Sequence, residues 1–83
     1  MSTHEIREMI SKTGHFVFAD GHNDEGMIIC RYNIPVAKLE YYLIPSDNIS
    51  AYNKARLSYE PDAHVRLGKQ IDIESISNAR MIH

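Results

Sequence analysis

The stretch "MIICRYNIPVAKLEYYLI", residues 27–44, decides the fold. Two strand-like runs, 27–34 and 38–44, lie on either side of Pro35 and are rich in β-branched and aromatic residues. Proline cannot donate a hydrogen bond to a strand ladder, so we expect the chain to bend there. The first run begins apolar on both faces, as in a strand covered from two sides, whereas the second alternates. The pattern therefore predicts two neighbouring strands, of which the first is central in the sheet and the second could lie at its edge.

A further strand-like run, "HFVFA" at residues 15–19, precedes these two. Between it and the next run lies a short polar gap, residues 20–26. The gap opens on Asp20-Gly21, a dipeptide that is a strong signal for a hairpin turn. We therefore predict a three-stranded antiparallel meander over residues 15–44.

Helices are predicted before and after the meander. Residues 3–13 carry apolar side chains at helical spacing, after a capping box formed by Ser2 and Glu5. Residues 46–59 favour a helix of about ten residues with a serine or aspartate cap. The competing interpretation makes 49–52 a short strand or a single 3₁₀ turn.

The C-terminal part is predicted to be extended. Residues 60–63, "EPDA", read as a turn, and apolar residues alternate through most of 64–73. The alternation changes phase afterwards, which a bulge at Glu74–Ser75 or a terminal helical turn would explain. One or two closing strands are therefore expected.

Together these elements predict a single α+β domain over residues 1–83. It would contain an N-terminal helix, a curved antiparallel meander, a short second helix and C-terminal strand(s). The same order also suits a small SH3-like or Sm-like β-barrel with an N-terminal helix, in which segment 46–59 would be reduced to a turn. A chain of 83 residues buries only about 60–65% of its unfolded surface, so its stability is expected to depend on a partner or on a second copy of the chain.

Composition narrows the possible functions. The chain is 43% hydrophobic and carries a formal net charge of −2, with five basic and five acidic residues interleaved over residues 42–83. No apolar run approaches the ~18–20 residues that would span a bilayer, and the N-terminus lacks a signal-peptide pattern. A single cysteine excludes an internal disulfide and favours a reducing, cytoplasmic location.

The polar gap raises the question of a metal site. Two histidines and two aspartates in or beside it are weak metal candidates: His15, Asp20, His22 and Asp24. A calcium loop counted from Asp20 would need a glycine at its sixth position and a glutamate at its twelfth, where the chain has Glu25 and Arg31. We therefore interpret the gap as an ordinary hairpin turn without a metal.

Catalytic motifs are missing from the sequence. It contains no glycine-rich phosphate loop, no nucleophile elbow and no C-x-x-C pair, and the five histidines are scattered. Cys30 lies in an apolar run, where a thiol is expected to be buried and inert. We therefore expect neither an enzyme nor a cofactor, and a metal-dependent enzyme ranks third among the functions considered.

The adjacent tyrosines Tyr41 and Tyr42 must point to opposite faces of their strand. Leucines share the face of Tyr41, which is therefore expected to be buried. Tyr42 shares its face with Lys38 and Glu40, and exposed tyrosine among polar residues is typical of an interface. We predict a protein partner and a homodimer with this strand near the contact. The alternative is that Tyr42 packs under segment 46–59.

A nucleic-acid-binding small barrel is the second function considered. It would gather aromatic residues for base stacking and basic residues for phosphate contacts. The candidates are Tyr52, Lys54, Arg56, Tyr59, Arg66 and Lys69, with Arg80 beside them. The interleaved acidic residues weaken this patch. The preferred function is a small intracellular, non-catalytic binding or regulatory module that acts through protein contacts.

Overall fold

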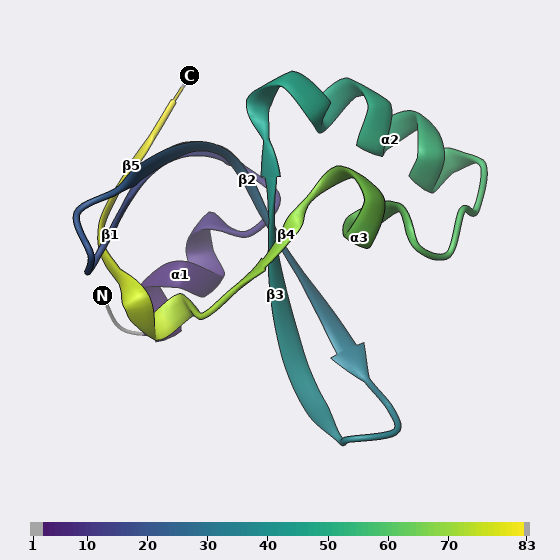
Figure 1. Cartoon of the computed structure of the whole chain (residues 1–83), viewed down its shortest axis with the longest axis horizontal. Helices are drawn as coiled ribbons and strands as arrows, with labels where there is room; N and C mark the ends of the chain where they lie inside the picture. Colours follow the sequence, from purple (N-terminus) through teal and green to yellow (C-terminus); the bar gives the residue numbers. More distant parts are fainter. Residues whose placement is uncertain (1–2, 83) are drawn as a thin grey trace.

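The computed structural model describes residues 3–82, apart from the side chains of Thr3, His4 and Ile6. The predicted capping residue Ser2 and the terminal His83 lie outside these residues. In chain order the elements are α1 (Thr3–Met9), β1 (Thr13–Phe18), β2 (Asn23–Asn33), β3 (Lys38–Pro45), η1 (Ser46–Asn48), α2 (Ile49–Leu57), α3 (Ala63–Leu67), β4 (Lys69–Ile71), η2 (Ile73–Ser75) and β5 (Ile76–Met81) (Figure 1).

The strands form one antiparallel sheet in the order β4-β3-β2-β1-β5. Only residues 72–75 separate the two edge strands β4 and β5, and the sheet curls in the view of Figure 1. The predicted α+β class is confirmed, with its leading helix, curved meander, second helix and closing strands. The curl approaches the alternative barrel, but residues 49–57 form a helix where that alternative required a turn.

Two apolar clusters lie on opposite faces of the sheet because neighbouring residues of β2 and β3 point to opposite sides. The first cluster contains Phe16, Phe18, Ile28, Tyr41, Leu43, Ile73 and Ile76, with Met9 and Ile10 packed against it. The second contains Met27, Ile29, Tyr42, Ile44, Tyr52, Ala55 and Ala63. The sheet is therefore covered on both faces, as the apolar start of the 27–34 run predicts.

Two sequence predictions need correction. The first helix ends at Met9 rather than at residue 13, because Ser11 takes a left-handed φ of 70° and β1 begins at Thr13. The predicted extended run 64–73 begins instead as the helix α3. Its Ala63 and His64 are buried against the sheet, so covering the face of β3 outweighs the alternating pattern.

The change of phase near residue 74 is produced by the 3₁₀ turn η2. The Asp72 carboxylate accepts a hydrogen bond from the Glu74 amide at 2.9 Å, and the backbone amide of Ser75 donates to the Asp72 carbonyl. β5 then pairs with β1 along the second edge of the sheet, with a register shift between Val17 and Phe18. A short helical turn, rather than a bulge at Glu74–Ser75, therefore changes the phase of the alternation.

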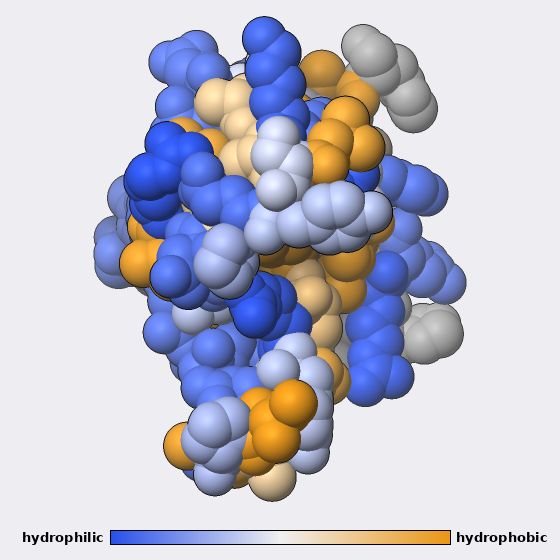
Figure 2. All heavy atoms as spheres, turned by 90° about the vertical axis from the view of Figure 1, so that its right-hand side faces the viewer, coloured by the Kyte–Doolittle hydropathy of each residue, from blue (hydrophilic) through white to orange (hydrophobic). Residues whose placement is uncertain are grey.

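The hairpin of β2 and β3 extends well beyond its neighbours (Figure 1). β1 pairs with β2 only as far as Met27, and β4 pairs with β3 only over Tyr41–Leu43. The outer part of the hairpin, residues 31–40, is hereafter called the arm; its turn spans residues 34–37. Figure 2 shows apolar side chains at the lower end of the molecule, where the arm ends.

Candidate functional site

A buried histidine lies where α3 packs on the sheet. His64 is 8% exposed, and its ring meets that of Tyr42 edge-on, with centroids 4.6 Å apart and planes at 82°. Burial lowers the pKa of His64, and the positive charge of Arg31 lowers it further. The imidazole is therefore neutral at pH 7.

Arg31 connects the base of the arm to this histidine. Its Nη1 donates to the carbonyl oxygen of Pro61 at 2.9 Å and lies 2.7 Å from Nδ1 and 3.0 Å from Nε2 of His64. A neutral imidazole has one nitrogen that can accept this bond, whereas a protonated one would hold two cations in contact. Arg31 thus fixes the chain around residue 61 to the sheet.

Glu40 organises the other side of the same region. Its carboxylate accepts hydrogen bonds from the Tyr42 hydroxyl at 3.2 Å and from Nδ2 of Asn33 at 3.0 Å. Burial raises the pKa of Tyr42, and the hydrogen bond to Glu40 adds to the increase. Tyr42 is therefore a neutral donor inside the fold.

Two hollows open on either side of Arg31 and His64. The first has a volume of about 310 Å³, and its lining includes Tyr52, Arg56, Tyr59 and Glu60. The second, of about 300 Å³, is lined on the arm side by Tyr32, Asn33 and Glu40, and its lining also includes Asp62. Both volumes lie at the lower end of the range for small-ligand sites.

The first hollow is electropositive. The Glu60 carboxylate is bound by Arg66 through two hydrogen bonds, of 3.0 Å from Nε and 2.9 Å from Nη2, which neutralise its charge. Among the described residues the guanidinium of Arg56 makes no hydrogen bond or ion pair. Because His64 is neutral, Arg31 and Arg56 give this hollow its charge.

Tyr59 stands at the rim of the first hollow in an unusual backbone conformation. α2 ends in a Schellman motif, in which the Tyr59 amide donates to the Arg56 carbonyl at 3.1 Å and the Glu60 amide to the Ala55 carbonyl at 3.0 Å. The motif places Tyr59 at φ 57°, where glycine is usual, yet its side chain is 91% exposed. Tyr59 therefore adopts an energetically unfavourable backbone conformation, although its side chain is almost entirely exposed to solvent.

The structure assembles only part of the predicted nucleic-acid patch. Tyr52, Arg56 and Tyr59 meet around the first hollow, although Tyr52 is 9% exposed. Lys54 is exposed on α2, Arg66 is engaged by Glu60, and Lys69 is held by Asp24 at 2.6 Å. Arg31, which sequence reasoning missed, replaces them in the hollow.

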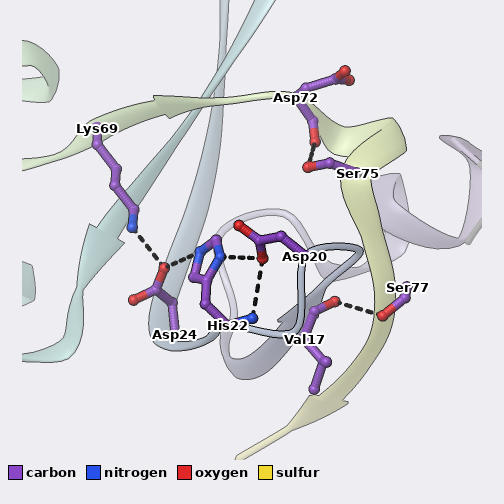
Figure 3. A network of polar contacts seen from close by, with 8 residues as sticks. All are labelled: Val17, Asp20, His22, Asp24, Lys69, Asp72, Ser75 and Ser77. Atoms are coloured by element: carbon purple, nitrogen blue, oxygen red, sulfur yellow. Dashed lines mark hydrogen bonds and ion pairs between the residues drawn. The ribbon is translucent and has the colours of Figure 1, made fainter.

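The residues of the polar gap bind one another (Figure 3). Nδ1 of His22 lies 2.5 Å from Asp20, its Nε2 lies 3.2 Å from Asp24, and its ring stacks on Phe18 at 4.4 Å. Hydrogen bonds from the His22 amide and ring lower the pKa of Asp20. The fourth candidate, His15, bonds Asn23 instead. Within residues 3–82 no group of three or more histidine, cysteine or acidic residues is arranged to hold a metal ion.

The expected exposure of Tyr42 is wrong. The residue is 7% exposed in the second cluster with Tyr52 and Ala55, so it packs under α2, as the alternative interpretation required. Its strand lies between β2 and β4 rather than at an edge. Lys38 is exposed on the arm, and Cys30 is half-buried against the first cluster.

Comparisons with known proteins do not assign the chain to a family. No protein-family model, curated protein or solved structure matches the chain. Within the described range, no helix has the length and apolar character needed to cross a membrane.

Proposed function

We propose that this chain is a small, non-catalytic binding module that acts through protein contacts made by the arm. The observation that carries this proposal is the exposure of apolar side chains on the arm: Tyr32 (56%), Ile34 (80%), Val36 (55%) and Leu39 (46%). Contiguous exposed apolar patches of this kind mark interaction sites on many soluble proteins. A reducing, intracellular location is part of the proposal and agrees with the free thiol of Cys30.

The backbone of the arm also supports a protein partner. Among the described residues, the outer edge of β2 has no backbone partner from Ile29 to Asn33, and that of β3 has none from Lys38 to Glu40. Free strand edges pair readily with strands of another chain, and an isolated two-stranded hairpin is only marginally stable in water. A partner strand would satisfy these groups and cover the apolar side chains together.

The partner we propose is a second copy of the chain. Lys38 is the only charged residue between Tyr32 and Leu39, so two arms can approach each other with little repulsion. Antiparallel pairing of identical strands is compatible with two-fold symmetry, the commonest symmetry of homodimers. The contact would lie at the exposed end of the strand that carries Tyr42, not at Tyr42 itself.

Sedimentation equilibrium tests this proposal with two matched variants. Ile34→Glu places a charge on the arm, whereas Leu57→Glu places one at a site of similar exposure on α2, 76% against 80%. The dimer dissociation constant should rise at least tenfold in Ile34→Glu, corresponding to about 1.4 kcal/mol, and stay near that of the wild type in Leu57→Glu. A monomeric wild-type chain would exclude the homodimer, and equal weakening by both variants would exclude the arm as the contact.

A further inference from the structure

The first hollow is lined by two guanidinium groups, those of Arg31 and Arg56, for which the described part of the chain provides no ion pair. Nη1 of Arg31 makes all of the hydrogen bonds of that side chain among the described residues, which leaves Nε and Nη2 available as donors. Within residues 3–82 no group accepts a hydrogen bond from the Arg56 guanidinium, and Glu60 is occupied by Arg66. Guanidinium groups bind phosphate and carboxylate oxygens through paired hydrogen bonds. The hollow is therefore suited to an anion.

The same hollow presents a planar apolar surface. The ring of Tyr59 is 91% exposed at the rim, and the Tyr52 ring and Pro61 line the wall. Tyrosine rings stack on nucleobases with little sequence preference, because every base has a flat π-face. An exposed ring suits a base that lies over it with its other face in solvent.

The backbone at Tyr59 gives an independent reason to assign the ring a role. A left-handed residue at the end of a helix is commonly glycine, and non-glycine residues in that region often cluster at ligand sites. Since the Tyr59 side chain is almost fully exposed, packing within the chain does not explain why tyrosine occupies this position.

We propose that the first hollow binds a nucleotide, with the base stacked on Tyr59 and the phosphate held by Arg31 and Arg56. A volume of about 310 Å³ falls within the range of small-ligand sites. The nucleotide can be free or part of a single strand, since both offer the same base and phosphate. A phosphotyrosine side chain also joins a ring to an anion, but the open position of Tyr59 favours a base over a ring that must be enclosed. This inference does not depend on the arm or on dimerisation.

Isothermal titration of the full chain tests the chemistry with defined probes: AMP, adenosine, inorganic phosphate, phosphotyrosine and hexa-adenylate. AMP should bind at least tenfold more tightly than adenosine or phosphate, because only AMP uses both the ring and the guanidinium groups. Tighter binding of phosphotyrosine than of AMP would overturn the proposal, as would equal binding of AMP and phosphate. Hexa-adenylate that binds tenfold more tightly than AMP identifies a strand as the source, and equal affinity identifies a single nucleotide.

Variants of the chain locate the site. Tyr59→Gly and Arg56→Gln should each weaken AMP binding about tenfold or more, whereas Tyr59→Phe keeps the ring and should retain binding. Arg80→Gln removes an exposed cation from β5, away from the hollow, and is the control for net charge. Glycine suits the backbone at position 59, so loss of binding in Tyr59→Gly cannot be attributed to unfolding. Wild-type affinity in Tyr59→Gly, or equal losses in Arg56→Gln and Arg80→Gln, would exclude this site.

Discussion

Replacing Tyr59 by glycine should make the folded chain more stable. The left-handed conformation costs a non-glycine residue about 1–2 kcal/mol, and glycine avoids this cost. Glycine in turn loses more backbone entropy on folding, by about 0.5–1 kcal/mol. The side chain is 91% exposed, so its removal forfeits little burial. The net gain in the free energy of unfolding is therefore about 0.5–1 kcal/mol, or about 2–8 °C in Tm for a domain of this size.

Urea denaturation of a small set of variants isolates the backbone contribution. Tyr59→Ala removes the ring but keeps Cβ, so its free energy of unfolding should stay within about 0.5 kcal/mol of the wild type. The difference between the glycine and alanine variants then measures the cost of the left-handed conformation minus the additional backbone entropy that glycine loses on folding. At Ser58, where φ is −89°, the order should reverse, with alanine more stable than glycine.

A Tyr59→Gly protein that is less stable than Tyr59→Ala would refute this reasoning. It would mean that the cost of the left-handed conformation is smaller than the backbone entropy that glycine loses on folding, or that the Cβ atom stabilises the folded chain. The expected result, a gain in stability, would show that tyrosine occupies this position at a cost to folding. That cost agrees with a binding role for its side chain, because strained residues cluster at functional sites.

Two further predictions concern the sheet and the buried histidine. Gly26→Ala should lower the free energy of unfolding, measured by urea denaturation, by at least about 2 kcal/mol. The added Cβ atom would lie 2.1 Å from the Ile44 carbonyl oxygen and 3.0 Å from Pro45 Cα. A loss below about 0.5 kcal/mol would mean that β2 and β3 separate easily. Burial, and then the charge of Arg31, lower the pKa of His64 in the folded chain. The contribution of His64 to the free energy of unfolding is therefore complete above pH ~6.5, the pKa of histidine in the unfolded state, and is lost as the pH falls toward the folded-state pKa. Unfolding midpoints across this range should depend less on pH in His64→Gln, and an unchanged slope would assign the dependence to other groups.

The sequence was sufficient to predict the sheet because its signals there are local. Pro35 and the two strand-like runs around it place the hairpin, and the run 27–34 begins apolar on both faces. Coverage from both sides follows directly from that composition. The helix α3 was not predictable in the same way. It has only five residues, and alternation of Val65 and Leu67 imitates a strand, so the need to cover the sheet decides its conformation.

The candidate site was predicted in part, and the missing part has a physical reason. Tyr52, Arg56 and Tyr59 lie on one helix and its end, so their proximity follows from helical spacing. Arg31 joins them from a strand that precedes α2, and in the sequence it looks like the polar residue that ends an apolar run.

Only the pairing of α3 with the sheet reveals what Arg31 does. That pairing places the Pro61 carbonyl and the His64 ring within reach of one guanidinium nitrogen, although they lie 30 and 33 residues away from Arg31 in the sequence. Arg31 also begins the arm, so one residue borders both the surface proposed for protein contacts and the hollow proposed for a nucleotide. The contacts of Arg31 depend on strand register and on the docking of α3, which are properties of the whole fold. The neighbouring residues in the sequence therefore do not predict them.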